Sequence, residues 1–448
     1  MQALKHIVVV ILFGGLIGCS KDKPEIKEEK PIQIQKFKRS FQGKGVIKAK
    51  YIQGHYFVLL EKLPPAGKCP GERSIELLNL AGATITAISN NSSAIIDADF
   101  DNEFVYLASI VSTGGNESVI VEKIDTAGNR IKTATILEEA KNLQVYDDRI
   151  KIIASKHNIY MAIFKNDETT YLFSLDISNL HEKWTLLIEP AVHRMPWAMN
   201  GGSYDDFGQM AHQYTVYLDA DEAGNAYVAI PVMGGAITTT LNFHNKYFGE
   251  SLTLKSSNSG MNTLPTDALV TKVSSGGQRI YSSVMGTVYH DEIHGMQVFQ
   301  EKIITYGRCP ITGFDDWDPY MSVNDTRTGS ELFARNYDAT SNGMFLAAGY
   351  DTLASNYYLG GVVDWSQNPS GVSVSEQGNK LLLTMNDQNG APGENIVLTN
   401  GPRQNQIRSI QILGDNLFLL GGWENGPGTH SGDGNPDLVF ADGFLEVR

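Results

Sequence analysis

The sequence predicts an all-β protein, a β-propeller of seven four-stranded blades, and three observations lead to this fold class. A nine-residue phrase occurs twice, as KIDTAGNRI from Lys123 to Ile131 and as KVSSGGQRI from Lys272 to Ile280. Short runs rich in Val, Ile, Tyr and Thr alternate with Gly and Asn turns, which is typical of strands. No convincing amphipathic helix follows residue 30. Four-stranded sheets repeated around an axis are the blades of a propeller.

The first 18 residues have the pattern of a secretory signal peptide. Lys5 precedes the apolar run from Ile7 to Ile17, which is shorter than the roughly 20 residues of a membrane-spanning helix. The stretch LIGC then ends at Cys19 and resembles a bacterial lipobox. The resemblance implies that the mature chain begins at Cys19, diacylated on sulfur and acylated on its new amine. Because Ser20 and not Asp follows, it also implies the outer membrane as the location in the cell envelope.

Residues 19–31 are predicted to be a lipidated Cys and a flexible tether. The stretch SKDKPEIKEEKP from Ser20 to Pro31 has too little apolar surface to fold. Residues 32–448 remain for the propeller. The formal net charge of the 448-residue chain is −14, which argues against a nucleic-acid partner, since such partners require a basic patch. We expect a monomer that contacts the membrane through its lipid.

Seven strand-forming runs mark the seven units. In two of them, DADFDNEFVYLASIV from Asp97 and DADEAGNAYVAIPV from Asp219, an acidic turn is expected to precede the apolar strand. The stretch LLNLAGATI from Leu77 to Ile85 is a weaker copy of the nine-residue phrase. The other five runs are HYFVLL (55–60), NIYMAIF (158–164), KIITYG (302–307), MFLAAGY (344–350) and NLFLLGG (416–422).

The stretch from Leu218 to Gly286 resembles the SBBP family of bacterial seven-bladed propeller repeats. DADEAGNAYV is similar to the turn and strand of that family, and TDALVTKVSSGGQRIYSSVMG is similar to its third and fourth strands. The resemblance continues to Gly307 and is poor from Asp351 to Gly401. It implies an extracytoplasmic scaffold, and it supplies no catalytic residues.

The two ends of the chain are predicted to share one blade. The C-terminal PDLVFADGFLEVR matches a third strand, and the chain then stops without a fourth. The stretch IQIQKFKRSFQG, from Ile32 to Gly43, resembles a spare fourth strand. We therefore expect residues 32–42 to pair antiparallel with residues 442–448, which closes the ring and hides two sheet edges. Pro31 and the tether would then leave at the end of the ring that carries the short turns.

Connection lengths divide the propeller into two faces. First-to-second and third-to-fourth turns share one face, and they are short, as in DADEAGN, DTAGN and SSGGQ. Second-to-third loops and blade-to-blade connections share the other face, where EPAVHRMPWAMNGGSYDDFGQMAH and WENGPGTHSGDGNP are long. Long loops on a rigid scaffold tend to carry function. We call these the short-turn face and the long-loop face, and we expect the second to be the working face.

Aromatic and acidic residues occur together on the long-loop face. Exposed aromatic rings stack on sugar or peptide faces, and carboxylates accept hydrogen bonds from hydroxyl and amide groups. Three interpretations stay open: aromatic rings that only plug the blade ends, a binding site, or catalysis by paired carboxylates. The candidate ligand-binding residues are Trp197, Tyr204, Asp205, Asp206, Asp315, Asp316, Trp317, Asp318 and Trp423.

Motifs for catalytic or metal chemistry are weak. HDEIH, from His290 to His294, has the spacing of a zinc-protease helix. Here it lies at the entry to a blade, where strand positions four apart are separated by about 13 Å, so we expect no zinc site. No G-x-S-x-G motif, P-loop or dinucleotide fingerprint is evident. The sequence therefore favours a protein without catalytic residues.

The stretch DGNPD imitates the start of a calcium loop through Asp433, Asn435 and Asp437. Leu438 and Phe444 stand where an EF-hand requires Gly and Glu, so an EF-hand is excluded. An irregular Ca²⁺ site and a simple polar turn both stay open, and no other cofactor is expected.

Two cysteines remain besides Cys19. Cys69 in GKCP and Cys309 in GRCP occupy the same loop position in blades one and five. A disulfide between them is conceivable in an oxidising compartment. The two blades are three steps apart in the ring, and a Cα separation above about 7 Å would exclude the bond.

These observations predict a lipid-anchored extracytoplasmic propeller scaffold that binds a protein or a glycan through its long-loop face. One alternative is an outer-membrane assembly scaffold, by analogy of fold alone. The other is a propeller glycosidase or lyase that uses two of the acidic residues named above.

Overall fold

The computed structural model of the protein contains two compact units, Met1–Ile34 and Gln35–Arg448, and the second is the subject here. Its regular elements are the β-strands β1 to β30. The structure describes residues 34–448 with these gaps: 63–71, 90–92, 114–115, 139–148, 166–168, 191–214, 234–237, 246–248, 256–265, 287–290, 311–316, 338–342, 364–378, 387, 399–403, 415–416 and 427–441.

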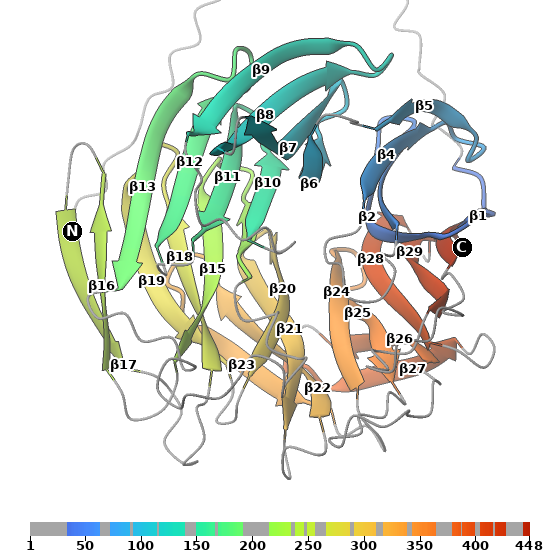
Figure 1. The fold of residues 1–448 in the computed structure, drawn as a ribbon. Coiled ribbons are helices and arrows are strands. Elements are labelled where there is room, and N and C mark those ends of the chain that lie inside the picture. Colours follow the sequence, from blue (N-terminus) through green and yellow to red (C-terminus); the bar gives the residue numbers. More distant parts are fainter. Residues whose placement is uncertain are drawn as a thin grey trace, which may run out of the picture. The chain divides into compact units, whose positions relative to one another are not determined.

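The strands form seven antiparallel sheets arranged in a ring, as the sequence predicts (Figure 1). Blade 1 contains β2 (Lys44–Ile52), β3 (His55–Lys62), β4 (Arg73–Leu78) and β5 (Thr84–Ile88). Blade 2 contains β6 (Ala94–Phe100), β7 (Phe104–Thr113), β8 (Asn116–Asp125) and β9 (Arg130–Leu137). Blade 3 contains β10 (Ile150–Ala154), β11 (Asn158–Phe164), β12 (Thr170–Asp176) and β13 (Glu182–Pro190). Blade 4 contains β14 (Tyr217–Ala220), β15 (Ala226–Met233), β18 (Thr266–Val273) and β19 (Arg279–Met285). Blade 5 contains β20 (Glu292–Phe299), β21 (Lys302–Pro310), β22 (Trp317–Asp325) and β23 (Glu331–Asn336). Blade 6 contains β24 (Gly343–Asp351), β25 (Asn356–Val363), β26 (Asn379–Asn386) and β27 (Pro392–Leu398).

Blade 7 is built from both ends of the chain, which confirms the predicted closure. It contains β28 (Gln404–Gly414), β29 (Leu417–Gly426), β30 (Asp442–Val447) and β1 (Phe37–Phe41). Phe37 lies opposite Val447, and Phe41 lies opposite Gly443, in an antiparallel register. Since β30 begins where the connection from β29 ends, Val447 and Phe37 lie at the short-turn end of the blade.

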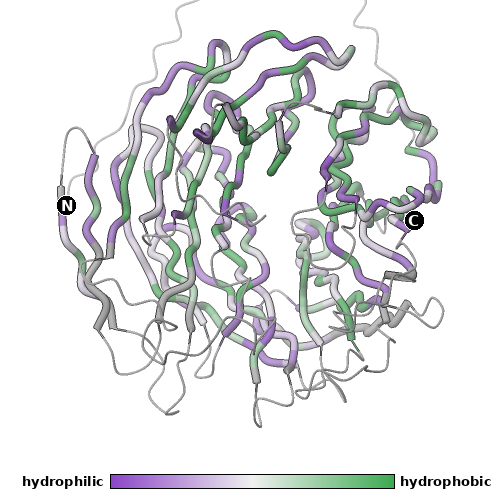
Figure 2. Tube along the Cα trace, viewed as in Figure 1, coloured by the Kyte–Doolittle hydropathy of each residue, from purple (hydrophilic) through white to green (hydrophobic). Residues whose placement is uncertain are grey.

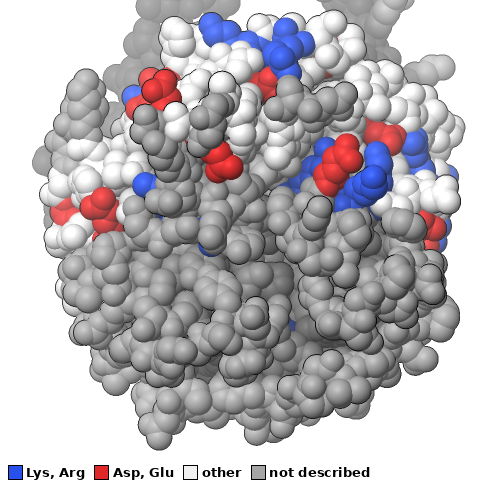
Figure 3. Space-filling model, viewed as in Figure 1, with Lys and Arg blue, Asp and Glu red and all other residues white. Residues whose placement is uncertain are grey.

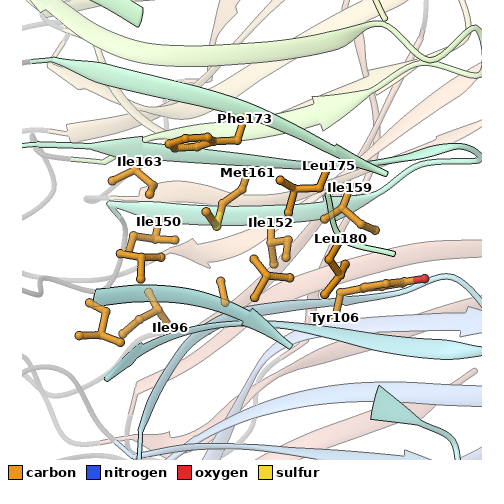
Figure 4. Packing of buried hydrophobic residues seen from close by; sticks show 14 residues of the cluster. Ile96, Tyr106, Ile150, Ile152, Ile159, Met161, Ile163, Phe173, Leu175 and Leu180 are labelled. Carbon is orange, nitrogen blue, oxygen red and sulfur yellow. The ribbon is translucent and has the colours of Figure 1, made fainter. Parts of the chain in front are cut away.

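The apolar core lies between consecutive blades. Figure 4 shows one such layer, in which Ile96 and Tyr106 of blade 2 face Ile152 and Met161 of blade 3. Equivalent clusters lie between blades 1 and 2, 3 and 4, 4 and 5, 5 and 6, and 6 and 7. Apolar residues accordingly recur along the strands of every blade (Figure 2). The near-continuous apolar second strands follow from this packing, because both of their faces meet a neighbouring sheet.

The repeated nine-residue phrase forms a turn and a β-bulge. Asp125 Oδ1 accepts hydrogen bonds from the N–H groups of Ala127 and Asn129, and Gly128 adopts a φ of 89°. A left-handed φ of this kind favours glycine, and Gly277 repeats it at 83°. Register shifts after each turn leave Ile131 and Ile280 as the extra residue on the outer strand.

The lysine that opens the phrase joins neighbouring blades. Lys123 Nζ donates to the carbonyl oxygen of Ile177 in blade 3 at 2.9 Å. Lys272 Nζ donates to the carbonyl oxygen of Thr326 in blade 5 at 3.0 Å. Both acceptors directly follow the aspartate that caps the third-to-fourth turn of the next blade. The phrase is therefore repeated because it builds the same joint twice.

Two details differ from the sequence predictions. In DADFDNE, the expected acidic turn is mostly strand, because Asp97 and Asp99 lie in β6 and the turn begins at Asp101. In addition, the connection between β15 and β18 was expected to be a loop. It contains a hairpin of β16 (Thr238–His244) and β17 (Gly249–Lys255), which extends blade 3 to six strands.

Candidate functional site

Most of the predicted site residues lie outside the described part of the chain. These are Trp197, Tyr204, Asp205, Asp206, Asp315, Asp316, the calcium candidates Asp433, Asn435 and Asp437, and also Cys69 and Pro31. Their roles stay predictions. Trp317 begins β22, and the structure also describes Asp318 and Trp423.

Trp423 lies in β29 at the joint between blades 7 and 1. Its indole packs so closely on Gly45 that an added Cβ there would lie 1.8 Å from Trp423 Nε1. The guanidinium of Arg408 lies 4.4 Å from the ring centroid, within cation–π range. Trp423 is half-buried, and these contacts fix its ring near the long-loop end of β29.

Asp318 is 1% exposed and lies directly opposite Cys309 in the pairing of β21 with β22. Burial raises the pKa of the Cys309 thiol, and Asp291 and Asp318 raise it further. Cys309 is a free thiol in the structure. Because Cys69 is outside the described residues, the proposed disulfide stays a prediction.

The HDEIH stretch enters blade 5 as a strand, as expected. β20 begins at Glu292, whose carboxylate accepts from Arg308 Nη2 at 2.7 Å. His294 Nε2 lies 3.5 Å from the other carboxylate oxygen of Glu292. His290 is not among the described residues. Within the described part of the chain, no group of three or more His, Cys, Asp or Glu residues is arranged to hold a metal ion.

A charged cluster that the sequence analysis missed lines the innermost strands around the central channel. Lys50 Nζ lies 3.3 Å from Asp99, and Lys48 Nζ lies 3.8 Å from both Asp97 and Asp99. Asp219 of β14 lies within electrostatic range of both lysines. The cluster therefore combines two bases and three acids from blades 1, 2 and 4.

These side chains also bind the backbone of the next blade in the ring. Asp97 accepts from Ile152 N–H at 2.9 Å, and Asp99 accepts from Ala154 N–H at 2.8 Å. Asp219 accepts from Val298 N–H at 2.7 Å. An innermost strand has an open edge toward the channel, and these bonds satisfy groups on that edge. The alternating charges in KAK (48–50) and DAD (97–99) were the sequence signal of this link between blades.

The cluster shifts the pKa values of its members. Burial raises the pKa of Asp219 to about 6, although the N–H groups of Val298 and Ala220 oppose the shift. Burial also acts to raise the pKa of Asp99, but Lys50 and Lys48 outweigh it, and the pKa lies below its ordinary value. The two lysines pair with Asp97 and Asp99, and all three aspartates accept hydrogen bonds from backbone N–H groups, so the cluster joins blades without requiring a substrate.

The visible surface mixes charges of both signs. Figure 3 shows acidic and basic side chains close together at several places on that face. Elsewhere, Arg130 Nε of β9 lies 2.5 Å from Oε1 of the buried Glu122 in β8. Among the described residues, none forms a helix with the length and hydropathy of a membrane span.

Comparison with known proteins identifies no family and no function. No protein-family model and no curated protein matches the sequence. Among solved structures, a quinohemoprotein alcohol dehydrogenase from Pseudomonas putida is 8% identical, with a TM-score of 0.44 over 91% of this chain and 75% of that chain. The β-propeller domain of the Trilobed protease from Pyrococcus furiosus is 11% identical, with a TM-score of 0.40 over 85% and 90%. A periplasmic gluconolactonase from Pseudomonas aeruginosa is 12% identical, with a TM-score of 0.39 over 80% and 86%. Similarity at this level carries no argument about activity.

Proposed function

We propose that the protein is a lipid-anchored extracytoplasmic propeller that binds a protein or glycan through its long-loop face. The observation that supports this function is the point at which the chain enters the ring. β1 begins at Phe37, opposite Val447, and both residues lie at the short-turn end. For a chain anchored at Cys19, entry at this end favours a long-loop face directed away from the anchor.

The two ends of the blades support the same assignment. At the short-turn end, connections such as 53–54, 126–129 and 300–301 are minimal, and their polar groups are satisfied locally. At the other end, strands are separated by connections as long as 191–216 and 427–441. Insertions at one end of a rigid ring leave that end free to vary for recognition.

The anchor is tested by the variant Cys19→Ala. A lipidated protein fractionates with membranes, whereas Cys19→Ala should move into the soluble fraction, because several acyl chains supply most of the membrane affinity. Mass spectrometry of the mature N-terminus provides the second measurement. Membrane association that is unchanged in Cys19→Ala would contradict the anchor.

The working face is tested by a photo-crosslinking amino acid at Asp205 or Asp316, with Leu353 as the control position. Leu353 is 80% exposed in the short turn 352–355, so a crosslinker there is accessible to partners. We expect partners captured from whole cells at positions 205 and 316 only. Equal capture at 353 would contradict a working long-loop face. Cleavage of a polysaccharide that is lost in Asp→Asn variants would instead favour the glycosidase or lyase.

A further inference from the structure

The β16–β17 hairpin belongs to blade 4 in sequence and to blade 3 in structure. It interrupts blade 4 between β15 and β18, yet β16 pairs with β13 from Leu187↔His244 to Pro190↔Leu241. Blade 3 therefore already grows by accepting a strand from outside its own repeat. β17 becomes the terminal strand of that sheet, at the outer rim of the ring (Figure 1).

The hairpin is held firmly against both blades. Phe243 is fully buried in the core between blades 3 and 4. His244 Nε2 lies 2.7 Å from Glu189 of blade 3, and Glu250 is ion-paired with Arg279 of blade 4. Asn245 Nδ2 donates to the carbonyl oxygen of Gly277 at 3.1 Å. These contacts fix the position of β17, so its outer edge is a preformed surface.

The outer edge of β17 differs from the other blade edges. Outer strands β5, β9, β19 and β23 each contain a bulge near the short turn, which interrupts a regular edge. β1 is regular but carries Lys38 and Arg39, and charged residues also discourage strand addition. β17 pairs with β16 through seven consecutive residues without a register shift, from His244↔Gly249 to Thr238↔Lys255. Between Glu250 and Lys255 it has only uncharged residues.

We propose that the outer edge of β17 binds an extended segment of a partner protein by strand addition. In the described part of the chain, no further strand follows β17 in the sheet. The added strand would continue the order β13–β16–β17, and backbone hydrogen bonds would provide the affinity. This surface lies on the rim of the ring, in the connection between β15 and β18 (Figure 1).

The side chains of β17 define the chemistry of the segment. Leu252 is half-buried against the core of blades 3 and 4, whereas Ser251 is exposed on the opposite side of the strand. Residues opposite each other in adjacent strands share a face of the sheet. The segment should therefore be about five to seven residues long, with apolar side chains alternating with polar ones and without proline in the paired stretch.

A second copy of this chain is the less suitable occupant. Antiparallel pairing of two β17 strands about a two-fold axis reverses the second ring. Since β1 enters at the short-turn end, the two tethers would then enter at opposite ends of the assembly. This choice of occupant rests on the proposed anchoring to one membrane, whereas the binding edge itself does not.

A fluorescent peptide with the sequence of β16, TTTLNFH, tests the proposal on the full chain. This sequence pairs with β17 in the protein, with Leu241 opposite Leu252 and Asn242 opposite Ser251. We expect saturable binding by fluorescence anisotropy. The same peptide N-methylated at alternate residues keeps its side chains but loses donors, so its affinity should be at least about ten-fold weaker.

Hydrogen exchange locates the bound peptide, with β9 of the same molecule as the control. We expect slower exchange over residues 249–255 and no change over residues 130–137. Equal affinity of the N-methylated peptide, equal protection of β9, or no binding would overturn the proposal. The outcome that would overturn the choice of a partner protein is a stable dimer in sedimentation, together with slow exchange of β17 in the absence of peptide. That result would show that a second copy of the chain occupies the edge. Loss of membrane anchoring in the wild-type protein would contradict the proposed function and remove the argument against a second copy, but it would leave the binding edge itself unaffected.

Discussion

The joint between blades 3 and 4 differs from the joints that follow blades 2 and 4. At the joints that follow blades 2 and 4, the first lysine of the repeated phrase donates to a turn carbonyl oxygen of the next blade, that of Ile177 or Thr326. Between blades 3 and 4, Trp184 Nε1 donates to Ser275 O at 2.8 Å, at the corresponding place in the turn. The acceptor is constant because turn geometry fixes it, while the donor is free to change. The nine-residue phrase is therefore visible only at the joints where the donor is its first lysine.

The comparison predicts its largest effect at Trp184. Trp184→Ala removes a large, mostly buried side chain from the core between blades 3 and 4, so the free energy of unfolding should fall by about 3–5 kcal/mol. Trp184→Phe keeps much of the packing and loses the hydrogen bond, at a cost of about 1–2 kcal/mol. Denaturant titrations measure both. Equal losses would show that the hydrogen bond, and not packing, dominates this joint.

The next effect is expected at Gly277, which supports Trp184 from the turn of blade 4. An added Cβ at Gly277 would lie 2.7 Å from Trp184, and φ is +83°. Gly54 has a similar φ of +91° but nothing within 4 Å of an added Cβ. Gly54→Ala should cost about 1 kcal/mol through backbone strain, and Gly277→Ala about 1–3 kcal/mol more through overpacking. Equal midpoints in urea for the two variants would contradict the packing explanation.

The lysine joints should be weaker than the tryptophan joint. Lys123→Met and Lys272→Met each remove one charge-assisted hydrogen bond to a carbonyl and keep the aliphatic chain, at a cost of about 1–2 kcal/mol. Lys132→Met is the matched control, because Lys132 is exposed on β9 and should change stability by less than about 0.5 kcal/mol. Thermal unfolding of the three variants ranks them. A larger loss at Lys132 would refute the inter-blade role.

A dependence of stability on pH is expected at the innermost strands, where Asp219 links blades 4 and 5. Its pKa of about 6 lies above its ordinary value of 3.8, so the folded protein binds this proton more tightly than the unfolded chain. The contribution therefore stabilises the fold below about pH 4 and declines as the pH rises to about 6. In Asp219→Asn that decline should disappear, while the amide oxygen can still accept from Val298. Urea midpoints between pH 4 and 7 test this, and identical slopes would contradict the shifted pKa.

The fold was predictable where local sequence determines local structure. Asp125 and Gly128 form one turn, and Gly277 recurs in another, so the phrase revealed two blades directly. The spare strand was predictable because residues 442–447 end without a fourth strand. Blade 6 was difficult to align because NPSGVSVSEQGNK gives no clean register and because Asn386 takes the place of the turn aspartate, although β26 and β27 complete the sheet.

The pairing of the β16–β17 hairpin and the charged cluster depend on tertiary contacts that the local sequence does not determine. TTTLNFH and GESLTLK can form strands, but nothing within them specifies β13 as the partner. Asp97 and Asp219 resemble turn acids until the neighbouring blade supplies Ile152 and Val298 as donors. Of the candidate ligand-binding residues, Asp318 proves buried and Trp423 packs on Gly45, and the side chains of the others lie outside the described part of the chain.

The closure of blade 7 also sets an order of events during synthesis. Gly43 N–H donates to Asp442 Oδ1 across 399 residues of sequence, so β1 leaves the ribosome long before its partner strand β30. β1 must therefore wait, unpaired, until β30 has been made. Contacts this distant in sequence form slowly, so the ring should remain an open arc with exposed edges until β30 is available. A chaperone that protects strand edges would have its longest opportunity to act on this protein in that interval.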